Sequence, residues 1–366
     1  MHPPSTLHLR PRVLKELMGS LWTMSRYSTA WMSSISGESI PPAAPSDIVW
    51  SFSRHGQFEY CPRKYFFTYY NSGINGPFGE AVSYLKSLQS VPLALGVAVH
   101  SAIEKFLVDV KNGNNPTLED LHARGRDELT QIVQKMPFQE HFFTAGSYSL
   151  REWRDATLTA ALPKSEEALN HFYRSPILQS VILSHKGYLK QFNPERFVSF
   201  EVGEGIKVRA VIDLMVIWSG NPDNKLLLFD WKTGRASGSH DLQLGVYALW
   251  GQRVMKFPAS SIVLTPFYLT QNNYTKTVAT DVMMGEVEKN IVASHANLLT
   301  LHRAPLSAFP YAPEKERWKC TYCQFRNLCA GVRYRKNAEL SDVEAVKEAW
   351  EDAGSAAAAA KAAKKG

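Results

Sequence analysis

Two aspartates and a lysine in the middle of the chain have the residue types and spacing of a hydrolytic metal site. The run KLLLFDWKTG (225–234) ends an apolar stretch with Asp230 and Lys232 two positions apart. In a strand such residues share one face. Asp213 lies inside a second apolar run, VRAVIDLMVIW (208–218), where an unpaired acid is costly.

A hairpin between these two runs predicts that Asp213 faces Asp230. If its loop is symmetric about residues 221 and 222, residue i pairs with residue 443 − i, and these two acids are opposed. Opposed Cβ atoms lie about 4.5–5.5 Å apart, so the carboxylates repel unless a cation such as Mg²⁺ lies between them. Lys232 would then lie beside the metal-bound water, where it could orient that water or take its proton. A plain surface ion pair of Asp230 with Lys232 is the alternative, and the apolar surroundings of Asp213 count against it.

The elements that must position these residues alternate between helical and extended patterns. The expected helices are 96–110, most of 116–190 (with loops near Pro137, Pro163 and Pro176), 241–255 and 286–303. The β-rich stretches are 196–218 and 225–232, and 260–281 is expected to be a hairpin that turns at 271–273. This order predicts an α/β domain with a central sheet. No GxxxxGK[ST] phosphate loop is present, so the chain does not look like an ATPase.

The net charge of +7 is concentrated at the two ends of the chain. Three lysines follow Gly354 and the first 46 residues have a net charge of +2, which leaves +2 for the body, so a nucleic-acid surface would be a local patch. We find no apolar run of about 20 residues and expect no membrane span and a cytoplasmic protein. Residues 1–46, rich in serine and proline, are expected to be a disordered leader. The alternatives are a start codon assigned too far upstream and an organelle transit peptide.

With these residues in order, the chain resembles the PD-(D/E)XK nuclease superfamily, in its RecB-like branch. The resemblance covers about 51–331 and adds two motifs, GVAVH (96–100) and QLGVY (243–247). It implies that His100, Asp213, Asp230 and the backbone carbonyl of Trp231 bind Mg²⁺ or Mn²⁺. It also implies that Lys232 is catalytic, and that Gln243 and Tyr247 contact DNA and support Lys232.

The cysteines are arranged as one plus three: Cys61 in EYCPRKYFF, and Cys320, Cys323 and Cys329 in KCTYCQFRNLC. Four thiolates suit either zinc or an iron–sulfur cluster. The arrangement resembles the iron–sulfur nucleases of the same branch, including CRISPR-adaptation exonucleases and AddB-type subunits, which implies a four-iron four-sulfur (4Fe–4S) cluster with zinc as the alternative. The cluster would act as a clasp between the N- and C-terminal segments. Arg63 and Lys64, next to an aromatic run, are expected to bind single-stranded nucleic acid.

We therefore expect a restriction-endonuclease-like mixed central sheet flanked by helices, with an iron–sulfur clasp. The expected layout is a leader (1–46), a nuclease domain (47–335) with a helical insertion (112–195) and a cysteine cluster (320–329), and a C-terminal helix with a low-complexity tail (336–366). The expected activity is metal-dependent cleavage of DNA, exonucleolytic on single strands or free ends, in repair, recombination or defence. The rivals are a catalytically silent DNA-end-binding module and a subunit that needs a helicase or CRISPR-type partner.

Overall fold

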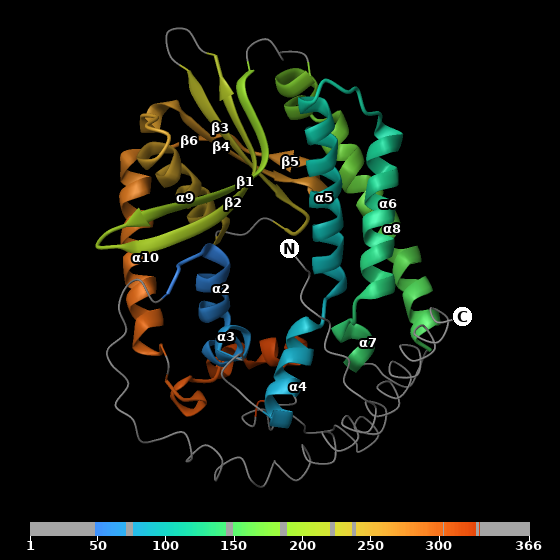
Figure 1. The fold of residues 1–366 in the computed structure, drawn as a ribbon, viewed down its shortest axis with the longest axis vertical. Coiled ribbons are helices and arrows are strands. Elements are labelled where there is room, and N and C mark those ends of the chain that lie inside the picture. Colours follow the sequence, from blue (N-terminus) through green and yellow to red (C-terminus); the bar gives the residue numbers. More distant parts are fainter. Residues whose placement is uncertain are drawn as a thin grey trace.

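A mixed sheet flanked by helices forms the centre of the molecule (Figure 1). The computed structural model of the chain describes residues 48–70, 76–143, 149–183, 189–219, 224–235, 239–302, 304–326 and 329. Its helices are α2 (Phe52–Tyr60), α3 (Pro62–Tyr69), α4 (Gly76–Ser87), α5 (Val91–Lys111), α6 (Leu118–Lys135), α7 (Gln139–Phe143), α8 (Leu150–Arg174), α9 (Ser239–Arg253) and α10 (Asp281–Thr300). Its strands are β1 (Leu189–Val202), β2 (Ile206–Trp218), β3 (Lys225–Lys232), β4 (Ile262–Tyr268), β5 (Asn273–Tyr274) and β6 (Thr277–Val278).

The strand order is β1-β2-β3-β4-β5, and β6 also pairs with β4. The first three strands are antiparallel neighbours, whereas β3 and β4 are parallel. Parallel neighbours need a crossover connection, which α9 provides. This arrangement confirms the predicted α/β class and is consistent with a restriction-endonuclease-like fold.

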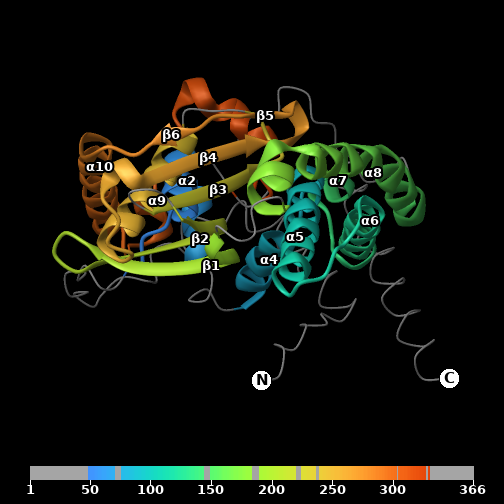
Figure 2. The ribbon, with the colours of Figure 1, turned by 90° about the horizontal axis from the view of Figure 1, so that it is seen from above.

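Helices cover both faces of the sheet. Figure 2 shows α9 and α10 on one side, and α5, α6 and α8 on the other. Side chains of β3 alternate between the two layers: Leu226 and Leu228 pack on the α9 side, Phe229 and Trp231 on the α5 side. Both faces of β3 are therefore buried, which explains its nearly unbroken apolar sequence.

The predicted register of β2 and β3 is confirmed. Leu214 pairs with Phe229 and Trp218 with Lys225, so paired residue numbers add up to 443 as expected. The turn predicted near 271–273 is also present, with Asn272 in the left-handed conformation (φ 48°) that asparagine tolerates better than most residues.

Two expectations about the elements were wrong. Pro163 does not make a loop but lies inside α8, where buried residues on both sides of it hold the helix together. The stretch 112–195 is not wholly helical, because β1 begins at Leu189; Pro194 is tolerated because β1 is an edge strand. The absence of a membrane span stays a prediction: α5 is long and apolar enough to cross a membrane, but eight of its residues are buried in the core.

The N-terminal helices pack against the C-terminal segment. The Tyr60 hydroxyl donates to the Lys319 carbonyl at 3.2 Å, and the rings of Phe67 and Phe325 lie 5.1 Å apart. Lys319 belongs to a 3₁₀ helix, Glu314–Tyr322. The expected leader (1–46) and C-terminal tail (336–366) lie outside the described residues.

Candidate active site

Asp213 and Asp230 come together where β2 and β3 separate. The ladder ends at Leu214 and Phe229, and the next pair in this register is the two aspartates. Asp213 Oδ2 accepts the Trp231 N–H at 2.6 Å, in place of a ladder carbonyl. Because the N–H and C=O of a strand residue point the same way, the Trp231 carbonyl also faces β2. The carbonyl predicted as a metal ligand is therefore directed to the side of Asp213.

His100 reaches the acids from α5. Its Nδ1 lies 3.2 Å from Asp213 Oδ1. Burial alone would lower the pKa of His100, but the nearby carboxylates of Asp213 and Asp230 outweigh burial and raise that pKa. Gly96 allows α5 to approach the turn after β3, since a Cβ at this position would lie 3.1 Å from Thr233 Oγ1. The GVAVH motif thus sets the histidine against the sheet.

A chain of hydrogen bonds ties Lys232 to α9. Lys232 Nζ donates to Gln243 Oε1 and Gln243 Nε2 donates to the Tyr247 hydroxyl, both at 2.7 Å. Tyr247 donates to the Val211 carbonyl at 2.7 Å and lies 3.1 Å from Asp230 Oδ1. Gln243 and Tyr247 are one helical turn apart, so both face the strand ends. The structure brings this predicted pair together with Lys232, and adds the Val211 carbonyl, which no sequence motif indicates.

Asp230 is buried within this network. Burial raises the pKa of its carboxyl to about 6; Asp213 adds to the rise, while Lys232 and His100 oppose it. The Tyr247 hydroxyl has one proton, and a backbone carbonyl can only accept it, so the Tyr247–Asp230 contact is a full hydrogen bond when Asp230 is protonated. Lys232 Nζ also forms an ion pair with Asp230 Oδ2 at 2.7 Å.

These oxygen atoms fit a hard divalent cation. Two neighbouring carboxylates and a nearby backbone carbonyl are the donors that Mg²⁺ and Mn²⁺ take. No three His, Cys, Asp or Glu side chains in the described part of the chain are grouped closely enough to form a preformed metal site. The chemistry of the donors fits such an ion, and His100, Asp213, Asp230 and Trp231 remain its predicted ligands.

All four cysteines line one small cavity, of about 20 Å³, between the N- and C-terminal segments. Cys61 joins α2 to α3, and the others lie at and after the 3₁₀ helix. Burial raises the pKa of the Cys323 thiol to about 11, while Lys64 opposes the rise. The structure therefore brings the one-plus-three set together without forming a preformed metal site. Four sulfur donors around one cavity suit either zinc or an iron–sulfur cluster.

Arg63 does not suit the nucleic-acid contact predicted for it. Its side chain is buried, Nε donates to the Phe309 carbonyl at 3.1 Å, and the guanidinium lies 3.9 Å from the centre of the Tyr311 ring. It therefore holds the C-terminal segment onto α3. Lys64 is half-buried at the cysteine cavity, with Nζ 4.9 Å from the Tyr60 ring, and its contact with DNA stays a prediction.

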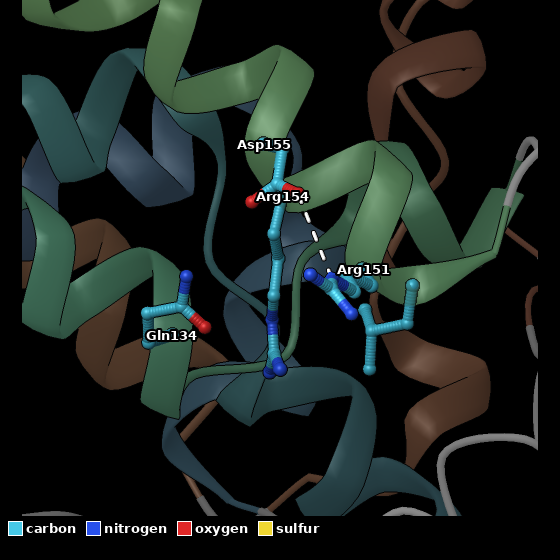
Figure 3. A pocket seen from close by; sticks show the side chains of 5 residues that line it. Gln134, Arg151, Arg154 and Asp155 are labelled. Carbon is cyan, nitrogen blue, oxygen red and sulfur yellow. Dashed lines mark ion pairs between the residues drawn. The ribbon is translucent and has the colours of Figure 1, made fainter.

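A larger cavity, of about 180 Å³, lies between the end of α6 and the start of α8 (Figure 3). Arg154 extends into it between Gln134 and Arg151, and Arg151 pairs with Asp155 at 4.0 Å. Its lining includes none of the predicted site residues. The candidate active site is thus defined by its acids and lysine and not by the size of a cavity.

Comparison with known proteins agrees with the geometry of the acids and the lysine. A model of the PD-(D/E)XK nuclease superfamily matches residues 49–330, which is most of the 366-residue chain. The matched range includes His100, Asp213, Asp230, Lys232 and the four cysteines. A search of the curated proteins found no match. On the family match, the chain belongs to the PD-(D/E)XK nuclease superfamily.

Proposed function

We propose that the chain is a Mg²⁺- or Mn²⁺-dependent deoxyribonuclease that acts as an exonuclease on single-stranded DNA or DNA ends. Membership of the superfamily makes it a nuclease by class, and such nucleases generally use one of these two ions. The observation that carries the proposal is the convergence of Asp213, Asp230 and Lys232 in one enclosed cluster. A surface ion pair would leave its carboxylate exposed, whereas Asp230 is only 2% exposed.

Each residue has a distinct role in this proposal. His100, Asp213, Asp230 and the Trp231 carbonyl hold the ion, which when bound polarises the phosphate and lowers the pKa of its water. Lys232 orients the attacking water and offsets the negative charge that develops on the phosphate oxygens. Lys232 is held for this task by Gln243, to which it donates at 2.7 Å.

A preference for single strands is supported by the surface around the 3₁₀ helix. Trp318 and Tyr322 are exposed there, with Lys319 between them along the chain. Exposed aromatic rings suit unpaired bases, while Lys319 itself is half-buried and paired with Glu316 at 2.5 Å. Lys64 lies beside the same segment, at the cysteine cavity.

We further propose that the four cysteines hold a 4Fe–4S cluster that clasps the two ends of the domain. The one-plus-three order and the shared cavity support this proposal. Zinc is the alternative, since its thiolate ligands are the same. A partner such as a helicase or CRISPR-type protein would deliver DNA to the site without changing these residues.

Cleavage of end-labelled DNA by the purified chain tests the proposed activity. Single- and double-stranded DNA, RNA of the same sequence and circular single-stranded DNA are incubated with Mg²⁺, Mn²⁺ or EDTA. We expect loss of the linear single strand with either ion and none with EDTA, and a circle that stays intact. Cleavage that persists in EDTA would contradict the metal-dependent mechanism, and a cut circle would contradict the exonuclease.

Variants decide whether the assigned residues are responsible. Asp230→Ala and Lys232→Ala should each lower the cleavage rate by at least about 100-fold, because both act at the attacking water. Asp155→Asn is the matched control, since it changes an exposed carboxylate in the α6–α8 cavity. If both site variants keep more than a few per cent of wild-type activity, the assignment is wrong. A wild-type chain that binds DNA ends but cuts nothing would support the silent or partner-dependent alternative.

A further inference from the structure

Two apolar side chains are exposed side by side on the hairpin formed by β1 and β2. Phe197 is 62% exposed and Val211 is 42% exposed, and the two residues are direct partners across the ladder. Opposed Cβ atoms in an antiparallel pair lie about 4.5–5.5 Å apart. Their sequence neighbours Val198 and Ile212 are buried, so the hairpin has one core face and one open face. We call the exposed pair the Phe197–Val211 patch.

The patch adjoins the acids. Val211 precedes Asp213 by two residues on β2, about 7 Å along the strand. The packing of β2 changes sides between them, because Ile212 belongs to the cluster on the α9 side and Leu214 to the cluster on the α5 side. The Val211 carbonyl also accepts the Tyr247 hydroxyl at 2.7 Å, which fixes its backbone to the polar network of the site. In Figure 2 the hairpin lies along one edge of the molecule, with β1 outermost. The patch is therefore a continuation of the candidate active site.

Basic residues follow the patch on the same face. Arg209 comes two residues before Val211 and pairs with Ser199, and Lys207 comes two residues earlier still. Both are exposed, and within the described ranges neither side chain forms an ion pair or a hydrogen bond. Outward from Asp213, β2 thus presents an acid, an apolar pair and two cations in order along the strand. With the scissile phosphate at the acids, the adjacent base of the same strand would lie at the apolar pair and the next phosphates at the two cations.

We propose that the Phe197–Val211 patch stacks an unpaired base next to the scissile phosphate, with Arg209 contacting a neighbouring phosphate. This inference rests on the proposed function and names its substrate class, single-stranded DNA. A base offers its face to an aromatic ring only when it is unpaired or at an end, so the patch selects single strands over the interior of a duplex. A second protein chain is a poorer occupant, because a stable interface needs about 800 Å² per partner and this patch has two side chains.

The test measures kcat and KM of Phe197→Ala, Phe197→Trp and Val211→Ala on labelled single-stranded DNA. Loss of one stacked base corresponds to an increase in KM of about 5- to 100-fold for Phe197→Ala, with kcat nearly unchanged. Phe197→Trp should retain the wild-type KM, since it keeps an aromatic face. Val278→Ala is the control, because Val278 is similarly exposed (48%) but pairs with β4, away from β1 and β2.

Abasic substrates locate the base. An abasic site moved along the strand should weaken wild-type binding at one position near the cut, and Phe197→Ala should be insensitive at that position. Binding in Ca²⁺, followed by fluorescence anisotropy, keeps the test independent of cleavage, so an inactive wild type would count against the nuclease and not against the patch. An unchanged KM and affinity in Phe197→Ala would overturn the inference. So would a wild-type dimer that Phe197→Ala dissociates, since the patch would then be a subunit contact.

Discussion

At the scale of single residues, the buried charge of Asp230 destabilises the fold but is needed for the proposed metal ion. Its carboxyl is buried beside Asp213, and its pKa is raised to about 6 because burial disfavours the charged form. The cation that would relieve this repulsion is the proposed cofactor. The protein therefore keeps a destabilising charge at the position where the ion is needed, as active sites commonly do.

Asp230→Asn should stabilise the protein in EDTA at pH 7.5, by up to about 3 kcal/mol in the free energy of unfolding. The pKa of Asp230 in the folded protein lies above the ordinary value of 3.8, which applies to the unfolded chain. The stability linked to this group is therefore full below about pH 4 and is lost as the pH rises through about 6. Asparagine resembles the neutral form and removes this loss. Denaturant titrations of both proteins at several pH values between 4 and 8 measure this difference in the free energy of unfolding.

The exposed carboxylate variant Asp155→Asn should leave the pH dependence unchanged. Adding Mn²⁺ should stabilise the wild type and not Asp230→Asn, because the variant lacks a charged ligand. If Asp230→Asn has the same stability as the wild type from pH 4 to 8, the buried charge is not destabilising.

Gln243 and Tyr247 should affect the rate of cleavage more than metal binding. Gln243→Ala removes the acceptor of Lys232, and Tyr247→Phe removes the hydroxyl that Gln243 donates to while keeping the buried ring. Each should lower kcat by about 10- to 100-fold, the usual cost of losing a partner of a catalytic group. Calorimetric titration with Mn²⁺ should give a wild-type affinity for both. Loss of Mn²⁺ binding in either variant would contradict this division of roles.

At the scale of elements, the hairpin of β2 and β3 was predictable because its signals are local. Two apolar runs and one polar loop fix the register, and the register alone brings Asp213 to Asp230. The hydrogen bond from the Trp231 N–H to Asp213 was not predictable, since it depends on where the strands separate. His100, Gln243 and Tyr247 were predicted from the order of their motifs along the chain, without knowledge of their contacts.

The missed features depend on contacts between distant parts of the chain. Arg63 is buried because it donates to the Phe309 carbonyl, 246 residues away, and nothing near Arg63 in the sequence indicates this. Pro163 stays helical because packing on both sides of it outweighs the local cost. The start of β1 at Leu189 follows from pairing with β2, which overrides a weak local pattern.

The contact of α9 with α10 sets how Gln243 and Tyr247 are presented. A Cβ at Gly245, between them on α9, would lie 2.3 Å from Val287 Cγ2 on α10. Gly245→Ala should therefore push the helices apart and lower the free energy of unfolding by about 1–3 kcal/mol. Thermal melts and cleavage rates measure the two effects, and both should fall together because α9 also holds Lys232 through Gln243.

Two further variants identify the cause. Gly285→Ala on α10 meets no atom within 4 Å, so it should leave stability unchanged or raise it by up to about 1 kcal/mol. Gly245→Ala combined with Val287→Ala should be less destabilising than the sum of the single changes, because the clashing methyl groups are gone. Additive effects would show that close packing is not the reason for Gly245.

At the scale of the whole molecule, the ends of the domain meet at the cysteine cavity. Cys61 comes from the N-terminal helices, and Cys320, Cys323 and Cys329 come from the C-terminal segment. Protein contacts across this junction include the Tyr60–Lys319 hydrogen bond and the packing of Phe67 on Phe325. A cluster bound by all four thiolates would add a covalent tie between these segments, and its binding energy would be folding energy.

Cys61→Ala should remove the cluster as thoroughly as Cys323→Ala. Wild-type protein purified without oxygen should be brown, absorb broadly at about 400 nm and contain about four irons per chain. Both variants should be colourless, melt earlier and keep some Mn²⁺-dependent cleavage at low temperature, because the acids lie on strands away from the cavity. Absorption, iron content and melting temperature measure these effects.

Tyr60→Phe separates loss of the cluster from general weakening of the junction. It removes the hydrogen bond to the Lys319 carbonyl while leaving all four thiols in place, so it should keep the colour and the iron. Its melting temperature should fall less than that of Cys61→Ala, since one partly exposed hydrogen bond contributes only about 1 kcal/mol. Colourless wild-type protein with one zinc per chain would replace the cluster by a zinc clasp. The roles of Asp213, Asp230 and Lys232 would still stand, because they depend on the strand ends and not on the cysteines.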